Sequence, residues 1–286
     1  MSQKNAILVK RARAKFLSSN LSLGLASSNP DSILTRSYWN SYHCCNILIQ
    51  EGKSLTSRYC KNRWCAVCNR IRTAKLINGY LPCLSQINDL YFITLTCKTV
   101  TAVNLPCRID YMLGILRSIL NHRKGRRMKI SGVRKLECTI RPNGHYHPHF
   151  HLVVETEQAA QYILDSWLSM NADVSTRNAQ DIRKADDKSL KELFKYFTKV
   201  TSKNGDICDY KRLDVVFRAM KGKRVYQPFG GIKMVSEDIE ELTVEQYDYL
   251  ENCEQLWKWN CNDWVSEYGE LLTGYVPSSK LASIFT

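Results

Sequence analysis

The sequence predicts an α+β fold, an antiparallel sheet with flanking helices. Its main evidence is an alternation of apolar and polar residues on both sides of Pro142, Asn143 and Gly144, which indicates a β-hairpin over residues 132 to 154. Before and after this hairpin, apolar residues recur at helical spacing. The other expected elements are strand 91 to 97, helix 108 to 121, helix 157 to 170, a strand near 179 to 183, helix 186 to 203, helix 209 to 221 and strand 225 to 231.

Three histidines lie at alternate positions of the second hairpin strand. Side chains alternate between the two faces of a strand, so His147, His149 and His151 project from the same face. Four of the six histidines in the chain lie between residues 145 and 151. This clustering predicts a metal site, and a polar strand face with ordinary histidines is the alternative.

Glu137 lies on the other strand of the hairpin, roughly opposite residues 149 to 151. One carboxylate and two imidazoles with open coordination positions suit a hard divalent ion that polarises a phosphate, such as Mg²⁺ or Mn²⁺. Placing Glu137, the histidines, Thr94 and Thr96 on one sheet face leaves the other face for helices 108 to 121 and 157 to 170.

The helix expected at residues 186 to 203 carries a candidate nucleophile. Its apolar residues form a buried stripe, and Asp186 or Asp187 is the expected N-cap. On the opposite face, Tyr196 lies one turn from Glu192 and one turn from Lys199. Tyrosine has a pKa near 10, so a metal-bound phosphate and a neighbouring ammonium are expected to assist its attack.

Three segments together resemble a known family. They are YFITLT at residues 91 to 96, YHPHFH at 146 to 151 and ELFKYFTK at 192 to 199. In this order they are similar to the three motifs of the rolling-circle replication initiators of small bacterial plasmids, within the HUH endonuclease superfamily. The similarity covers roughly residues 40 to 235 and implies the HUH-type antiparallel sheet.

The resemblance implies a nickase that cuts one strand of plasmid origin DNA, single-stranded or hairpin, through a tyrosine. The products are a 5′-phosphotyrosine and a 3′-OH primer. Tyr196 matches the nucleophile, and Glu192 the residue that activates water or a second attack at termination. Lys199 completes the motif. The superfamily pattern needs two histidines, matching His149 and His151, so His147 is a ligand, an outer partner or a bystander.

Two alternatives remain from the sequence. A relaxase or single-strand transposase of the same superfamily shares the histidine strand and the tyrosine. A non-catalytic, zinc-dependent DNA-binding regulator would need the basic surface and the cysteines but has no use for Tyr196. The absence of a P-loop pattern implies that unwinding comes from another protein, and a host helicase and polymerase are expected partners. No GxGxxG or serine-triad pattern occurs.

The charge distribution favours a nucleic-acid partner. Residues 1 to 235 carry 39 basic and 16 acidic side chains, whereas residues 236 to 286 carry 2 and 11. A basic loop between the helix and the hairpin is a candidate phosphate-binding site. Its candidate DNA-binding residues are Arg123, Lys124, Arg126 and Arg127.

The cysteine pattern predicts a structural zinc site. The chain begins with polar and basic residues and has no run long enough to span a membrane, so we expect a cytoplasmic protein in which clustered cysteines bind metal. Cys60, Cys65 and Cys68, with either Cys44 or Cys45, provide four thiolates for Zn²⁺. The other cysteines are expected to be small buried residues, namely Cys83, Cys97, Cys107, Cys138, Cys208, Cys253 and Cys261.

These observations divide the chain into four parts. We expect a mobile basic leader at residues 1 to 35, because sustained periodicity is missing there. A zinc-binding module follows at 36 to 80, with a helix from 69 to 80, and the catalytic domain spans 81 to 235. Residues 236 to 286 are expected to form an acidic helical tail rich in tryptophan.

Overall fold

The predicted hairpin forms the centre of a five-stranded antiparallel sheet. Its strands are β4 (Gly132–Ile140) and β5 (Tyr146–Glu155), and the order across the sheet is β6-β3-β5-β4-β7. Gly144 in the connecting turn has φ +80°, a conformation that glycine adopts without steric cost. The remaining strands are β3 (Leu90–Thr96), β6 (Asp181–Lys184) and β7 (Tyr226–Phe229).

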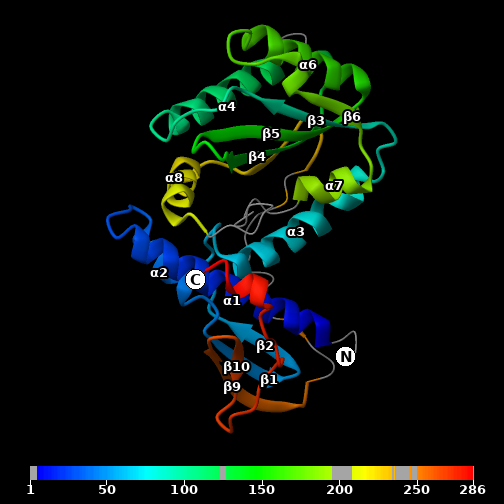
Figure 1. Cartoon of the computed structure of the whole chain (residues 1–286). Helices are drawn as coiled ribbons and strands as arrows, with labels where there is room; N and C mark the ends of the chain where they lie inside the picture. The colour runs from blue at the N-terminus through cyan, green and yellow to red at the C-terminus, as the bar shows by residue number, and fades with distance from the viewer. Residues whose placement is uncertain are drawn as a thin grey trace. The chain divides into compact units, whose positions relative to one another are not determined.

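Helices cover the two faces of this sheet differently. α4 (Leu105–Asn121) and α6 (Glu157–Met170) lie on one face, and α7 (Asp187–Phe194) lies on the other (Figure 1). Phe150 meets Trp167 of α6 edge to face, with the ring centroids 5.9 Å apart. Asp186 caps α7 through the amide of Ser189, at 2.8 Å, as predicted.

The computed structural model describes residues 5–122, 127–194, 208–233, 235, 245–246 and 250–285. These residues fall into two compact units. The sheet above belongs to the unit drawn from residues 76–197 and 215–236. The other unit takes its residues from 1–75, 198–214 and 237–286, so it combines parts of the expected leader, zinc module and tail.

The expected mobile leader is wrong for residues 5–28, which form the helix α1 (Asn5–Ser28). Leu8, Ala12 and Leu25 are fully buried, and so is the polar Lys15. The buried face of α1 therefore mixes apolar side chains with lysine, arginine and serine. This mixture hides the helical period from an analysis of hydrophobic residues alone.

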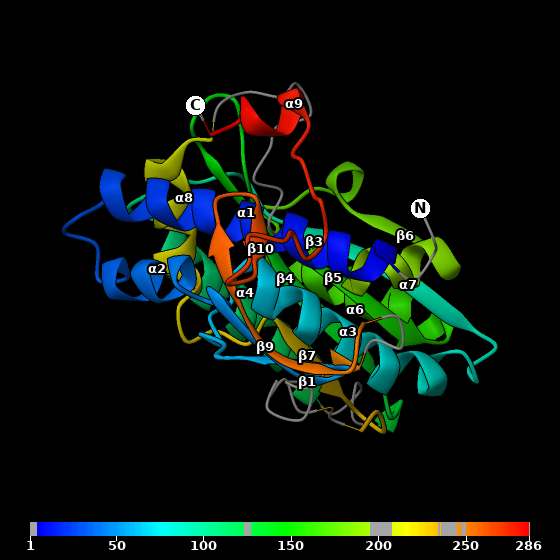
Figure 2. The ribbon, with the colours of Figure 1, turned by 90° about the horizontal axis from the view of Figure 1, so that it is seen from below.

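The expected helical tail is also wrong. Residues 253 to 265 form a hairpin of β9 (Cys253–Asn260) and β10 (Asp263–Val265). β9 pairs with β1 (Ile47–Gly52), side by side in Figure 2. The sheet order is β10-β9-β1-β2-β8, with β2 (Ser54–Ser57) and β8 (Glu245–Gln246) completing it. Trp257 and Trp259 alternate with polar residues, so the period is two rather than 3.6.

Four further helices and one 3₁₀ turn complete the described secondary structure. They are α2 (Thr35–Tyr42), α3 (Ala66–Leu84), α8 (Tyr210–Met220), α9 (Ser279–Ala282) and a 3₁₀ turn at Arg177–Ala179. Among the described helices, none combines the length and the apolar composition that crossing a membrane requires.

Only some of the cysteines outside the cluster are buried. Burial raises the pKa of Cys97 to about 11 and the pKa values of Cys138 and Cys208 to about 12, which keeps these thiols protonated. Cys83, Cys107 and Cys261 are exposed, contrary to the expectation that all were core residues.

Trp264 gives a test of the tail hairpin. Its side chain is fully buried, and its indole Nε1 donates a 2.9 Å hydrogen bond to the carbonyl oxygen of Cys45. We expect Trp264→Ala to lower the free energy of unfolding by about 3–5 kcal/mol, measured in urea, because it leaves a large cavity. Tyr268→Ala, at a side chain that is 79% exposed, is the control and should change it by less than about 0.5 kcal/mol. Equal effects of the two substitutions would contradict the hairpin.

Candidate functional site

The strand register places the candidate residues in adjacent rows on one sheet face. Glu137 pairs with His149, and His149 pairs with Thr96. In the next row Lys135 pairs with His151, and His151 pairs with Thr94. Paired residues of neighbouring strands project from the same face, so the predicted placement of these side chains is confirmed. This face is the one on which α7 lies.

Glu137, His149 and His151 form a compact group. One possible ligand atom from each residue lies within 4.8 Å of those of the other two. The Glu137 Oε2 atom is 3.3 Å from the Nε2 atom of His149 and 3.3 Å from that of His151. Both histidines are buried, with exposed fractions of 7% and 9%. Two imidazole nitrogens and one carboxylate oxygen therefore face a common point, where a divalent ion could bind.

Hydrogen bonds at the far nitrogen of each ring set this orientation. The His149 Nδ1 atom is 3.0 Å from the carbonyl oxygen of His147, which can only accept a hydrogen bond. The His151 Nδ1 atom is 3.2 Å from the hydroxyl of Thr94. With a metal ion bound, each ring could keep its proton on Nδ1 and offer the Nε2 lone pair, on the side that faces Glu137, to the ion. Both rings are thus oriented so that they could serve as metal ligands.

Glu137 is kept in its charged form. Burial alone would raise its pKa, but hydrogen bonds from His149 and His151 and the ammonium of Lys135 hold that pKa below its usual range. Lys135 forms an ion pair with the Oε1 atom, which leaves Oε2 for the histidines. The carboxylate is therefore available as a ligand at neutral pH.

His147 is not part of this group. Its ring stacks on that of His149 with the centroids 5.3 Å apart, and its Nδ1 atom is 3.0 Å from the guanidinium of Arg141. Burial, together with the charges of His149 and Arg141, lowers the pKa of His147 to about 4, so the ring is neutral at physiological pH. Its ring stacks on His149 and its carbonyl oxygen holds the His149 ring, but its imidazole nitrogens are not part of the group.

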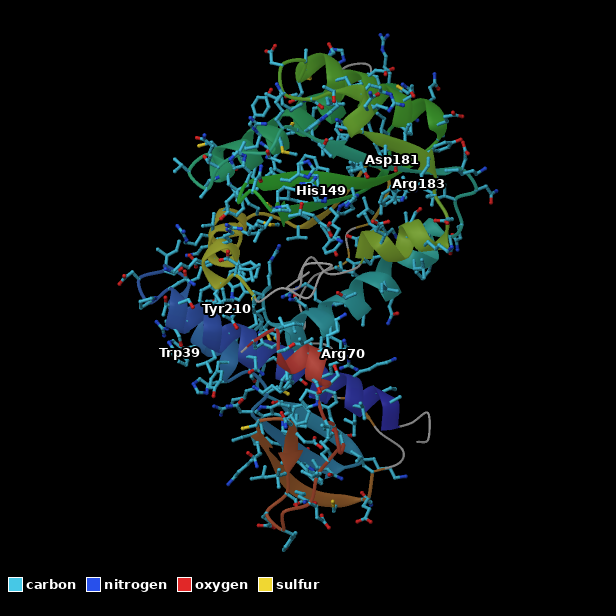
Figure 3. All side chains as sticks on the ribbon, in the orientation of Figure 1. Trp39, Arg70, His149, Asp181, Arg183 and Tyr210 are labelled. Atoms are coloured by element: carbon cyan, nitrogen blue, oxygen red, sulfur yellow. The ribbon has the colours of Figure 1, made fainter. Side chains whose placement is uncertain are left out.

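Glu192 lies on α7, on the same side of the sheet. Its carboxylate is 3.5 Å from the guanidinium of Arg183, and its main-chain oxygen accepts a 3.2 Å hydrogen bond from Lys135. Figure 3 labels Arg183 and Asp181 on the edge strand and His149 within the sheet. The guanidinium carbon of Arg183 also lies 4.4 Å from the centre of the Phe92 ring. Phe92 in turn packs on His151, with the ring centroids 5.3 Å apart. A continuous set of contacts thus joins Glu192 to the metal group.

Several predicted site residues lie outside the described part of the chain. They are Tyr196, Lys199, Arg123, Lys124 and Arg126. Of the four basic candidates, Arg127 alone has a described position, and its side chain is exposed. Their roles in catalysis and DNA binding therefore stay predictions.

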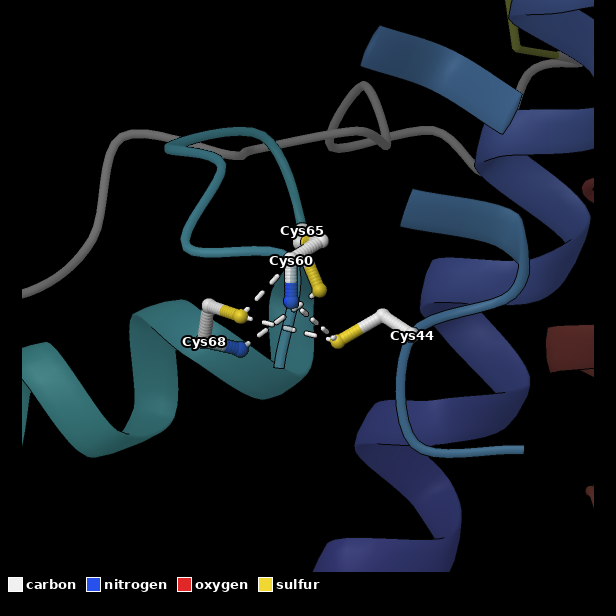
Figure 4. Close-up of side chains that lie close together, drawn as sticks. All are labelled: Cys44, Cys60, Cys65 and Cys68. Carbon is white, nitrogen blue, oxygen red and sulfur yellow. Dashed lines mark hydrogen bonds between the residues drawn. The ribbon is translucent and has the colours of Figure 1, made fainter. Parts of the chain in front are cut away.

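Four cysteines form a second group, in the other unit. The sulfur atoms of Cys44, Cys60, Cys65 and Cys68 lie within 4.8 Å of one another and point toward a common centre (Figure 4). Cys68 Sγ is 3.6 Å from the sulfurs of Cys44 and Cys60. A tetrahedral zinc site with Zn–S bonds near 2.3 Å needs S···S distances of about 3.8 Å. The arrangement is therefore compact enough for a metal ion bound by four thiolates.

The structure distinguishes Cys44 from Cys45. Cys45 has φ +60°, so the chain reverses there and its sulfur lies 3.7 Å from the guanidinium of Arg11 instead. Main-chain amides support the ligands themselves: Cys60 donates to the Cys44 sulfur at 3.3 Å, and Cys68 donates to the Cys65 sulfur at 3.5 Å. The hydrogen bond between Cys44 and Cys60 raises the pKa of Cys44 and lowers the pKa of Cys60.

α1 supplies polar side chains beside the cysteines. Ser18 donates a 3.2 Å hydrogen bond to the sulfur of Cys65. Lys15 donates to the carbonyl oxygen of Tyr42 at 2.7 Å, and burial lowers its pKa while the nearby thiols oppose that shift. Sequence patterns did not single out these residues, nor did they single out Lys135 and Arg183. One available signal was the serine and lysine at helical spacing within residues 11 to 22.

Comparison with known proteins gives the family. The model of the family described as "Replication protein" matches residues 52–263, which is well over half of the chain. "Protein rep" of Staphylococcus aureus is 26% identical over 166 residues, covering 52% of this chain and 72% of that protein. "Protein rep" of Lentilactobacillus hilgardii is 28% identical over 102 residues, covering 34% of this chain and 32% of that protein. No solved structure matches. The motif resemblance is thereby confirmed, and the chain belongs to the replication protein family, to which the Rep initiators belong.

Proposed function

We propose that this chain initiates rolling-circle replication of a plasmid by nicking one strand at the origin through Tyr196. The observation that carries the proposal is the Glu137, His149 and His151 group on the sheet face that also carries α7. In the sequence, Tyr196 follows the last residue of α7, Phe194, by two positions. Membership of the replication protein family supports a role in plasmid replication. The metal group supports metal-assisted cleavage of a phosphodiester bond.

The donor set favours Mg²⁺ or Mn²⁺ at this group. One carboxylate oxygen and two imidazole nitrogens leave coordination positions for phosphate oxygens and water. A divalent ion bound there would polarise the scissile phosphate and stabilise the charge that develops on it. The ligand atoms are oriented by the Thr94 hydroxyl, the main-chain carbonyl of His147 and the Lys135 ammonium.

The proposed reaction exchanges one phosphodiester for another. The Tyr196 oxygen attacks phosphorus, the bond from phosphorus to the 3′ oxygen breaks, and the tyrosine proton is lost as the 3′ oxygen gains one. The products are a 5′-phosphotyrosine and a free 3′-OH that primes synthesis. Lys199 is placed one turn from Tyr196 by the sequence, where an ammonium would favour the phenolate.

The cysteine group suits a structural zinc ion. Four thiolates saturate a tetrahedral ion and leave no position for substrate, unlike the histidine group. Zinc at Cys44, Cys60, Cys65 and Cys68 would join the chain around residue 44 to the first turn of α3. We infer that this site stabilises the fold of its unit and takes no part in catalysis.

The proposed partners follow from the charge and the chemistry. Origin DNA, single-stranded or as a hairpin, is the substrate, with the basic set at residues 123 to 127 on its phosphates. A host helicase and a host polymerase, in the cytoplasm, would complete replication after the nick. A relaxase or transposase function is less well supported because the family model is that of replication proteins. A purely regulatory DNA-binding protein does not account for the metal group on the α7 face.

Cys44→Ser and Cys45→Ser test the zinc assignment as a matched pair. Both substitutions remove one buried thiol from neighbouring positions, but only Cys44 has its sulfur in the four-cysteine group. We expect Cys44→Ser to reduce zinc per chain and to destabilise the unit, because structural zinc contributes folding free energy. Cys45→Ser should retain the zinc of the wild type, measured by elemental analysis of protein purified under reducing conditions. Equal zinc content in the two variants would refute the choice of Cys44.

Tyr196→Phe tests the nucleophile. The wild-type chain should form a covalent adduct with a labelled single-stranded oligonucleotide from the origin in Mn²⁺, and should not form it in EDTA. Tyr196→Phe removes only the attacking oxygen, so we expect no adduct, whereas the matched Tyr111→Phe on α4 should behave as the wild type. Gel electrophoresis under denaturing conditions measures the adduct. Full adduct formation by Tyr196→Phe would exclude this tyrosine.

Glu192→Gln tests termination. The first nick needs the tyrosine and the metal, whereas release by water needs a base within hydrogen-bond reach. We expect Glu192→Gln to form the adduct at a rate close to that of the wild type and to accumulate DNA strands longer than one plasmid unit. Glu157→Gln, on α6 and so on the opposite sheet face, is the control. Normal termination by Glu192→Gln in a plasmid carrying two origins would exclude the role of Glu192.

A further inference from the structure

Lys135 is a fully buried lysine between the metal group and α7. It lies on β4, two residues before Glu137, and its exposed fraction is 0%. Burying an ammonium costs several kcal/mol unless charged and polar partners surround it. An apolar side chain of similar size would fill this position at lower cost. The contacts of Lys135 therefore indicate what the lysine contributes.

The first contact fixes a candidate metal ligand. The Nζ atom forms an ion pair with the Oε1 atom of Glu137, while Oε2 faces the two histidines. The carboxylate is thus held with one oxygen turned to the lysine and the other to the metal position. Groups that orient a ligand in this way typically change metal affinity by a factor of about 10–100 when removed.

The second contact reaches α7. The same Nζ atom donates a 3.2 Å hydrogen bond to the main-chain oxygen of Glu192, near the end of the helix. It also lies 5.9 Å from the centre of the Tyr226 ring, on the neighbouring strand. Tyr226 stacks on Phe194, the last residue of α7, with the ring centroids 6.1 Å apart. One ammonium group therefore contacts the metal ligand, the helix and the aromatic ring that packs on Phe194 of that helix.

We propose that Lys135 is a positioning residue that holds the metal ligand Glu137 and the helix α7 in a fixed relation to each other. This inference rests on the proposed function, in which Tyr196, two positions after Phe194 in the sequence, is the nucleophile. Because Lys135 joins Glu137 to Glu192, the ligand and α7 share one anchor. A displacement of about 1 Å in such an arrangement can lower a reaction rate about 100-fold.

The test uses Lys135→Met in the full chain, which replaces the ammonium by an apolar side chain of similar length. Mn²⁺ affinity is measured by calorimetry without DNA, and adduct formation is then measured at saturating Mn²⁺. We expect Mn²⁺ affinity to fall about 10-fold or more. The adduct rate at saturating Mn²⁺ should fall about 10- to 100-fold as well, because added metal does not restore the position of α7.

Lys184→Met is the matched control. Lys184 lies on β6 of the same sheet, and its side chain is 69% exposed, so this substitution should leave both quantities unchanged. Thermal unfolding shows whether each variant is folded. If Lys135→Met does not fold, Lys135→Gln, which retains a neutral donor, takes its place, and the same two losses are expected.

Each result has a defined meaning. Unchanged or tighter Mn²⁺ binding by the folded variant would overturn the role of Lys135 on the ligand. A lower affinity with a wild-type rate at saturating Mn²⁺ would overturn the role of its contact with α7. A wild-type chain that forms no adduct contradicts the proposed function itself, so its failure is seen before the variants are compared.

Discussion

The pairing of β4 with β5 is the constraint on which the site depends. A single register places Glu137 beside His149 and Lys135 beside His151, while Phe150 turns to the helices on the other face. Because side chains alternate along a strand, a slip of one residue would move the carboxylate to the opposite face. The apolar face prevents such a slip, because Leu136 is paired there with Phe150 and both are fully buried. Core packing and ligand geometry are thus determined by the same register.

The two candidate metal groups differ in how the chain surrounds them. The histidine group uses neighbouring strands, and it keeps one side for other ligands because its three donors come from one sheet face. The cysteine group takes Cys44 from the loop after α2, Cys60 and Cys65 from the segment before α3, and Cys68 from the first turn of α3. Its sulfurs point toward a common centre. Buried cations accompany both groups, Lys135 beside the carboxylate and Lys15 beside the thiols. Each cation offsets part of the negative charge that metal ligands concentrate in a protein interior.

Local patterns predicted much of this structure. The hairpin, the helix at 157 to 170 and the face shared by Glu137 and His149 follow from periods of two and 3.6 residues, which short segments reveal. α1 and the β9–β10 hairpin were missed for a different reason. Lys15 is buried through partners more than 25 residues away, and Trp257 is placed by pairing with Leu48. The sequence could not distinguish Cys44 from Cys45, because the difference depends on the positive φ angle of Cys45. It could not reveal the role of Lys135 either, because that role depends on where α7 lies.

The pairing of β1 with β9 also affects the order in which the chain can fold. Gln50 accepts a hydrogen bond from the indole of Trp257, 207 residues later, and both are buried. A ribosome releases the cysteines long before it releases this strand, so β1 waits without its partner during most of synthesis. Closing so long a loop also slows folding, because its entropy is lost before the contacts form. Zinc bound early at the cysteines would order the segment around Cys44 to Cys68 before β9 has been made. Chains cut short before residue 250 would expose the edge of β1 and become targets for proteolysis.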